Sequence, residues 1–365
     1  MADKIRLGLI GASVRGTWSA RSHLPALRAS GDVELTAVCT TKADSAEAAR
    51  QAYGAKLAFH DYNTMIASGA IDAVAVVVRV PSHYAPTKAA LEAGKHVYCE
   101  WPLGRTTAEA VELTALAKAK GLVTAIGLQA RVNPTLMYMK ELFDGGFTGE
   151  VLAVRVGLMR EGVLTRPSNR TWQRDASLGA NTLTIANGHT IDAMRYVIGD
   201  VSRLSAVVAT QAKQWLDTGT NVWVDVTSPD NILVSGWLAN GAVLSSHVSN
   251  IPYAGSGYRM EIYGREGTLV AWGEDSPQLS KVFLEGARGI NAMAVIPVPE
   301  RFTIATPGTP PDEAENVGQM YKLFAQAIRG GATSHPTFET AVGLHRLVDT
   351  IKQSSDTGRE MTFAG

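Results

Sequence analysis

The stretch Leu7–Trp18 reads "LGLIGASVRGTW" and decides the fold of the first third of the chain. An apolar run ends at Gly11, and Ser13 and Gly16 complete a G-x-S-x-x-G array. A glycine-rich turn between a strand and a helix lets backbone N–H groups approach a pyrophosphate at the helix N-terminus. By itself the turn is a weak signal, because a glycine is also useful wherever a chain simply reverses direction.

The segments after this turn supply its context, because strand-like and Ala-rich helix-like segments alternate up to residue 127. The strands are expected at Ile5–Ile10, Val33–Cys39, Leu57–Phe59, Ala73–Val78, His96–Cys99 and Val123–Ile126. Helical spacing separates them at Ser45–Tyr53, Tyr84–Ala93 and Thr107–Lys120. This alternation predicts a doubly wound parallel sheet, a Rossmann domain of strand order 3-2-1-4-5-6. The turn in this context predicts nucleotide binding.

The pattern changes after Asn133, where long alternating segments replace the strand–helix repeat. Strands are expected at Val151–Met159, Leu204–Ala212, Ile232–Ala239, Val243–Val248, Tyr258–Tyr263 and Thr268–Trp272. Helices are expected at Met137–Phe143, Ala180–Val197, Glu313–Ile328 and Phe338–Lys352. Since single cores seldom exceed roughly 250–300 residues, we expect two domains. Residues 1–130 form the Rossmann domain, and residues 131–365 form an α+β domain with a large, mostly antiparallel open sheet, whose final helices are able to pack back on the first.

Composition excludes some partners and indicates the compartment. The formal net charge is zero and the pI is about 7.1, so nothing indicates nucleic acid or an anionic membrane as a partner. In the expected sheet Cys39 and Cys99 lie roughly 14 Å apart, whereas a disulfide needs Cα atoms within about 7 Å. Two buried free thiols favour a reducing compartment, and we expect a cytoplasmic protein. An open sheet with an uncovered face favours a homodimer or homotetramer. No metal site is expected.

The cofactor is expected at the carboxyl ends of the parallel strands, where such sheets bind ligands. The second strand ends in Thr40, Thr41 and Lys42 rather than an acidic residue, which favours NADP over NAD. The alternative is that these residues only cap a helix and face solvent. Altogether the expected cofactor contacts are Gly11, Ser13, Val14, Gly16, Thr40, Thr41, Lys42, Arg79, Val80, His83, Glu100, Trp101 and Pro102.

Three stretches carry a family resemblance: "GLIGAS", "AGKHVYCEWP" and "NGHTIDAMRYVIG". With them the chain resembles the glucose–fructose oxidoreductase / inositol dehydrogenase / MocA family. The resemblance implies NAD(P)-dependent hydride transfer. In most catalytic relatives the fifth strand ends in Glu-Lys-Pro, and the Lys helps to move the proton of the substrate oxygen. Here Trp101 replaces that Lys while Pro102 is kept, and an indole cannot exchange a proton with an alcohol.

The second family motif is also only partly present in this sequence. Enzymes of the family commonly carry Asp, then His four residues later, then Asp three after that. Here those positions are Ile185, His189 and Asp192. His189 and Asp192 share a helical face, so Asp192 would orient an imidazole that carries protons. The alternative is a buried polar pair whose members satisfy each other.

The loop "RTWQRD", Arg170–Asp175, also resembles the family. Its Trp172 and Arg174 are expected either to line the substrate pocket or to pack the loop. The expected substrate contacts are Trp101, Trp172, Arg174, Asn187 and His189.

These patterns lead to two hypotheses of different class. The first is an NAD(P)-dependent oxidoreductase of a sugar, polyol or related cyclic alcohol or ketone, with His189 as proton carrier and Trp101 shaping the pocket. An NAD(P)-assisted redox glycosidase is a variant of it, and Tyr98, His83 or water would replace His189 if it is not the carrier. The second follows from Glu-Trp and "GHTID", which look most like the fungal galactose-pathway repressors. Such a chain would bind a dinucleotide and a protein partner without catalysis.

Overall fold

The computed structural model describes residues 3–14 and 18–365 of the chain. It forms two compact units. The N-terminal unit comprises residues 1–132 and 303–342, and the sheet unit comprises residues 133–302 and 343–365. Across the described ranges no helix has the length and apolar character that crossing a membrane requires.

The N-terminal unit is built on a six-stranded sheet of order β3-β2-β1-β4-β5-β6. All five neighbouring pairs are parallel. This confirms the predicted Rossmann sheet and its strand order. The strands are β1 (Ile5–Ile10), β2 (Val33–Cys39), β3 (Leu57–Phe59), β4 (Ala73–Val76), β5 (His96–Glu100) and β6 (Thr124–Gly127).

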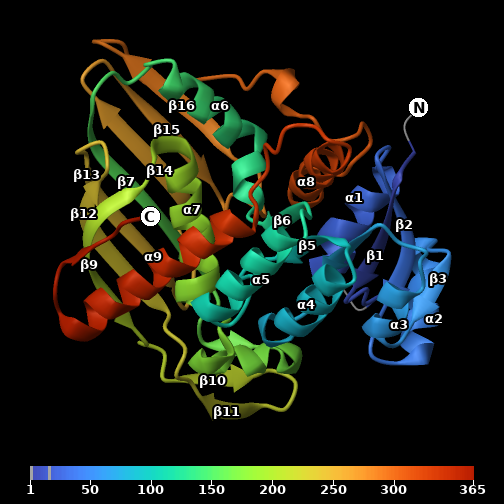
Figure 1. Ribbon diagram of the computed structural model, residues 1–365. Coiled ribbons are helices and arrows are strands. Elements are labelled where there is room, and N and C mark those ends of the chain that lie inside the picture. Colours follow the sequence, from blue (N-terminus) through green and yellow to red (C-terminus); the bar gives the residue numbers. More distant parts are fainter. Residues whose placement is uncertain (1–2, 15–17) are drawn as a thin grey trace. The chain divides into compact units, whose positions relative to one another are not determined.

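Helices of the N-terminal unit surround this sheet (Figure 1). They are α1 (Leu24–Ala29), α2 (Ala43–Tyr53), α3 (Tyr62–Ala67), α4 (Tyr84–Glu92), α5 (Thr107–Ala119) and α8 (Glu313–Ile328). Side-chain caps fix where some of them begin: Asp61 accepts from the N–H groups of Asn63 and Thr64, and Thr106 accepts from that of Glu109. α8 has the bounds that its sequence predicts. It packs on α1 and β2, although α1 ends at Ala29 and α8 begins only at Glu313.

The sheet unit is built on nine strands in the order β17-β16-β15-β14-β7-β13-β12-β9-β18. Only β7 and β13 pair in parallel among its neighbouring strands in the described ranges, which confirms the predicted large, mostly antiparallel sheet. The strands are β7 (Val151–Arg160), β9 (Val201–Ala209), β12 (Asn231–Leu238), β13 (Val243–Asn250), β14 (Gly257–Gly264), β15 (Gly267–Gly273), β16 (Phe283–Arg288), β17 (Ala294–Val295) and β18 (Met361–Thr362).

Helices α6 (Pro134–Asp144), α7 (Asn187–Ile198) and α9 (Phe338–Thr357) pack on this sheet (Figure 1). α6 contacts β15 and β16, and α7 contacts β7 and β13. α9 extends five residues beyond its predicted end. Apolar side chains also remain exposed on the strands: Leu152, Val207, Leu233, Val243 and Tyr263. The homodimer or homotetramer stays a prediction.

A second, three-stranded sheet in the sheet unit escaped the sequence analysis. Its order is β11-β10-β8, and its strands are β8 (Thr165–Arg166), β10 (Gln214–Asp217) and β11 (Val222–Asp225). Strands of two to four residues are too short to show a period, so their pairing partners define them rather than their composition.

The cysteines are free and buried, as predicted. Cys39 ends β2 and Cys99 lies in β5, with β1 and β4 between them. Burial, together with the charge of Asp61, raises the pKa of Cys39 to about 11. Both thiols therefore behave as small apolar side chains rather than as reactive groups.

Candidate functional site

The turn after β1 has the geometry that only glycine allows. Gly11 has a φ of +96°, and a Cβ at this position would lie 2.1 Å from the carbonyl oxygen of Val77. Hydrogen bonds hold the turn: the N–H of Gly11 donates to the carbonyl of Cys39, and the carbonyl of Gly11 accepts from the N–H of Ser13 and the hydroxyl of Ser19. Backbone thus lies close-packed at the end of β1, which fits a dinucleotide pyrophosphate. Val14 is exposed, and Gly16 lies outside the described residues.

Of the residues after β2, Thr40 stabilises the turn into α2, whereas Thr41 and Lys42 are exposed to solvent. The hydroxyl of Thr40 donates 3.0 Å to the carbonyl of Lys42 and lies 2.6 Å from the hydroxyl of Ser45, so it closes the turn into α2. The side chains of Thr41 and Lys42 are exposed. Both are therefore available to a ligand at the end of β2.

The histidine after β4 ties two strand ends together. The ring of His83 is buried, with Nδ1 2.7 Å from the carbonyl of Pro102 and Nε2 3.0 Å from that of Val78. Burial lowers the pKa of His83. This geometry gives the ring a structural role and leaves it unsuited to carry a substrate proton, while its expected contact with the cofactor stays a prediction. Of its neighbours, Val80 is buried and Arg79 is exposed.

Glu100 at the end of β5 takes part in a buried network. Its Oε1 lies 2.8 Å from Nε2 of His23, and Gln129 Nε2 donates to both carboxylate oxygens at 2.9 and 3.1 Å. The network continues from His23 Nδ1 to the hydroxyl of Tyr321 at 2.7 Å, and from Gln129 to the hydroxyl of Tyr98 at 3.2 Å. We call these five residues the Glu100 network. The carboxylate thus takes part in the core of the N-terminal unit, and its expected contact with the cofactor stays a prediction.

Electrostatics agree with a core role. Burial raises the pKa of Glu100, but the hydrogen bond and charge of His23 and the bonds from Gln129 and Trp18 outweigh it and hold that pKa below its usual range. Burial and the charge of Glu100 raise the pKa of Tyr98 well above its ordinary value. A phenol so placed is a poor proton carrier at neutral pH.

Trp101 and Pro102 follow directly after β5 and are both buried, with Trp101 5% exposed. The peptide bond between them is cis. Stacking of Trp101 on a substrate or nicotinamide stays a prediction.

In the sheet unit, His189 and Asp192 lie on α7 and are 6% and 0% exposed. A π-helical turn at Thr182–Ala186 leads into α7, and the capping box of Asn181 and Thr184 fixes where that turn begins. Asn187 is buried and donates to the carbonyl of Leu183 at 3.3 Å. It therefore holds the first turn of α7.

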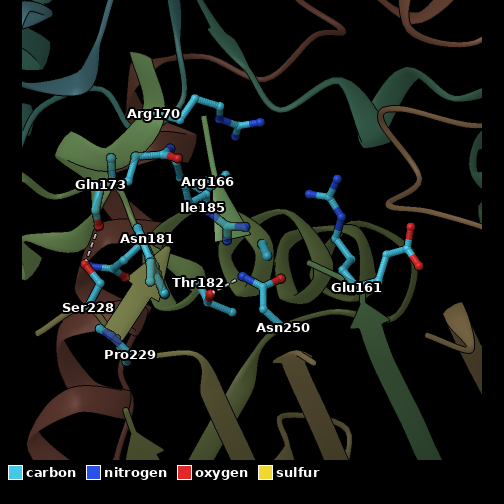
Figure 2. A pocket seen from close by; sticks show the side chains of 14 residues that line it. Glu161, Arg166, Arg170, Gln173, Asn181, Thr182, Ile185, Ser228, Pro229 and Asn250 are labelled. Atoms are coloured by element: carbon cyan, nitrogen blue, oxygen red, sulfur yellow. Dashed lines mark hydrogen bonds between the residues drawn. The ribbon is translucent and has the colours of Figure 1, made fainter. Parts of the chain in front are cut away.

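A cavity of about 190 Å³ opens beside this first turn. We call it the arginine pocket and define it by Arg160, Arg166, Arg170, Asn181, Ile185 and Asn250, which line it (Figure 2). Ile185 stands where the family motif expects Asp, and His189 follows one helical turn later. The structure therefore brings the pocket and the His189 helix together.

The loop Arg170–Asp175 contributes Arg170 and Gln173 to the lining of the arginine pocket. Among the described residues, neither Trp172 nor Arg174 lines the pocket. Arg174 is exposed and donates to the carbonyl of Asp225 at 3.2 Å, so it packs the loop against β11. Arg166 and Arg170 were not among the residues expected at the substrate pocket. The clustering of Arg160, Arg166 and Arg170 in the sequence could have indicated them. In the same described ranges no group of three His, Cys, Asp or Glu side chains is placed to hold a metal.

Comparison with known proteins covers both units. Residues 5–128 match the family model described as oxidoreductase family, NAD-binding Rossmann fold, and residues 140–363 match that of its C-terminal alpha/beta domain. Levoglucosan dehydrogenase of Pseudarthrobacter phenanthrenivorans is 28% identical over 85% of this chain and 84% of its own length. The galactose/lactose metabolism regulatory protein GAL80 of Saccharomyces cerevisiae is 28% identical over 66% of this chain, and dehydrogenase aclE of Aspergillus oryzae is 32% identical over 56%. The chain spans only 60% and 58% of the lengths of these two relatives.

Solved structures agree on the fold. A super-repressor mutant of Gal80p from Saccharomyces cerevisiae superposes with a TM-score of 0.87 at 22% identity, covering 99% of this chain and 98% of the other. Levoglucosan dehydrogenase in complex with NADH and levoglucosan gives a TM-score of 0.85 at 21% identity over the whole of both chains. At such identities the likeness concerns the fold alone. The two family models together span almost the entire chain, which therefore belongs to the glucose–fructose oxidoreductase / inositol dehydrogenase / MocA oxidoreductase family.

Proposed function

We propose that this chain is an NAD(P)-dependent oxidoreductase that moves hydride between nicotinamide and the carbon of a hydroxyl or ketone on a sugar, polyol or related cyclic compound. One observation carries the proposal: the arginine pocket opens at the start of α7, and Ile185 in its wall precedes His189 by one turn. A polar cavity beside a titratable group is the arrangement expected of a substrate site. The levoglucosan dehydrogenase relative, solved with NADH and levoglucosan, supports this substrate class.

In this reaction His189 and Asp192 handle the proton of the substrate hydroxyl. NAD(P), when bound, accepts or donates the hydride. His189 takes the proton from the substrate hydroxyl in the oxidative direction and returns it to the oxygen in the reductive direction. Asp192 lies three residues later on the same helical face, where it orients the imidazole and stabilises its cationic form. The buried setting of both side chains keeps competing water away from that proton.

NADP is the preferred cofactor in this proposal, because the exposed Thr41 and Lys42 offer a hydroxyl and a cation to a 2′-phosphate. NADPH should bind at least about tenfold more tightly than NADH, a difference of about 1.4 kcal/mol. Lys42→Ala should weaken NADPH binding and leave NADH binding nearly unchanged, as measured by calorimetry. The control is Lys56→Ala, an exposed lysine that pairs with Glu34 instead. Equal affinities of the wild type, or tighter binding of NADH, would reject the assignment.

Turnover is the direct test of the proposal. The wild-type chain is mixed with NAD or NADP and an excess of sugars, polyols, inositols or their ketones, and nicotinamide absorbance is followed through a single turnover. We expect at least one cyclic polyol or sugar to reduce the cofactor. If no compound of a broad panel does so in either direction, the oxidoreductase function is wrong.

One observation favours a second candidate, a dinucleotide-binding regulator that recruits a protein partner. Trp101 stands where most family enzymes have Lys, and it cannot transfer a proton. The 28% identity with GAL80 supports the same function. Calorimetric binding of NADP without any turnover in the panel would favour this candidate over the enzyme.

A further inference from the structure

Three cationic side chains surround the cavity beside α7, and they come from different elements. Arg160 ends β7, Arg166 ends β8, and Arg170 lies in the short helical segment Ser168–Arg174. In Figure 2 the carboxylate of Glu161, which also lines the cavity, is directed away from Arg166 and Arg170. Positive charge therefore predominates where these two arginines meet the cavity.

The charge of Arg160 is already compensated, and that of Arg166 is not. Arg160 forms an ion pair with Asp275, with Nε 2.7 Å from Oδ1. Arg166 instead donates to the carbonyls of Gly162 and Thr165, and no carboxylate pairs with it within residues 3–14 and 18–365. A half-buried guanidinium without a carboxylate is costly, which suits a site that receives its anion from a ligand.

The guanidinium of Arg166 is also held in a fixed plane. Its central carbon lies 4.7 Å from the centroid of the Trp215 ring, so stacking and two backbone bonds fix its orientation. Burial, with the charges of Arg170 and Arg160, lowers the pKa of Arg166 to about 10, so it stays protonated at neutral pH. A planar, pre-oriented guanidinium is well suited to two parallel hydrogen bonds with a carboxylate or phosphate.

The start of the helix adds to the positive electrostatic potential that the arginines create in the cavity. Asn181 caps the π-helical turn that leads into α7, and Thr182 follows it, with both residues lining the cavity. Asn250 Nδ2 donates 2.7 Å to the hydroxyl of Thr182 and so fixes that side chain. The positive end of a helix favours anions. At about 190 Å³ the cavity is smaller than the roughly 300–1,000 Å³ of drug-sized sites, so it suits a small molecule.

We propose that the arginine pocket binds the anionic group of an acidic, sugar-like substrate, a carboxylate or a phosphate ester, through Arg166 and Arg170. The statement that the bound anion belongs to the substrate rests on the proposed function. Anion binding by the pocket is tested separately, by measuring affinities. Such binding makes the preferred substrate an acidic sugar rather than a neutral one. Arg166 and Arg170 are then specificity-determining residues, because a neutral sugar would leave the charge of Arg166 without a carboxylate or phosphate beside it.

The experiment compares three probes of one ring type: D-glucuronate, D-glucose 6-phosphate and neutral D-glucose. Calorimetry at low salt, with and without NADP, measures their affinities for the wild-type chain. One of the two acidic sugars should bind at least tenfold more tightly than glucose, and its identity tells carboxylate from phosphate. Arg166→Met should remove most of this preference, and Arg170→Met a smaller part. The control Arg265→Met removes an exposed arginine that pairs with Glu150 in the same unit and should change nothing.

Each remaining outcome is decisive. If neither acidic sugar binds, or glucose binds as tightly as they do, the pocket is not an anion site. If the arginine variants weaken all three sugars equally, Arg166 only packs the loop, and the proposal is wrong. Arg170 is exposed, so Arg170→Met tests the pocket even if Arg166→Met fails to fold. If an acidic sugar binds preferentially but no sugar is turned over, the anion pocket stands and the oxidoreductase function is wrong. If neutral sugars are turned over and acidic sugars are not preferred, the oxidoreductase function stands and the anion pocket is wrong.

Discussion

Replacing His189 with alanine should lower kcat by about 10²–10⁴-fold and leave the affinity for NADP(H) nearly unchanged, because general acid–base catalysis contributes about that much. His189 is 6% exposed on α7, one turn beyond the wall of the arginine pocket. Asp192→Asn should cost less, since it disturbs the orientation of the imidazole without deleting it. The measurement is single-turnover hydride transfer by nicotinamide absorbance, with the best substrate of the panel.

The matched control is His247→Ala, an exposed histidine on β13 of the same unit that lies 3.1 Å from Asn231. It should retain full turnover. If turnover survives in the His189 variant as well, the enzyme stands and the proton carrier is wrong. An ordered water would then be the next candidate, because Tyr98 and His83 are both engaged in buried hydrogen bonds.

Glu100→Ala should destabilise the N-terminal unit by about 3–5 kcal/mol, the usual cost of removing one partner of a buried ion pair. The substitution leaves His23 Nε2 without the carboxylate that faces it in the core, and Gln129 Nε2 keeps only the hydroxyl of Tyr98 among its acceptors in the network. Urea unfolding followed by circular dichroism measures the loss. The control is Glu112→Ala, which breaks the exposed pair with Lys88 and should cost less than about 1 kcal/mol. A similar cost for the two variants would contradict the structural role of Glu100.

The same network predicts a dependence on pH. The folded-state pKa of Glu100 lies below its unfolded value of about 4.3, so the unfolded chain binds more protons between the two values. The stability from this carboxylate is fully present above that unfolded value and is lost as the pH falls through the folded pKa. The difference in unfolding midpoint between the wild type and Glu100→Gln should therefore narrow below pH 4. A difference that stays constant down to pH 3 would mean that Glu100 is not the titrating group.

The sequence by itself determined the element order and the first turn. Apolar runs such as Ile5–Ile10 and Val33–Cys39 became strands with the predicted bounds. Their parallel order followed from the helices between them, since crossover connections leave few topologies. Gly11 was identified for the same local reason, because its neighbours along the chain already require a tight turn. These features depend on contacts that are short in sequence, or on rules that hold for every sheet of this class.

Only the tertiary structure decided what the polar side chains do. Glu100 meets His23 and Gln129, and His23 in turn meets Tyr321. The positions of these residues along the chain give no sign that they share one core. Likewise, the sequence around Arg166 is typical of a solvated charge. Only the tertiary structure places the Trp215 ring of β10 against its guanidinium and the segment that leads into α7 across the same cavity. The physical reason is that burial and charge compensation depend on distance in space. A periodic pattern records which face of an element is apolar, but not which distant side chain lies opposite it.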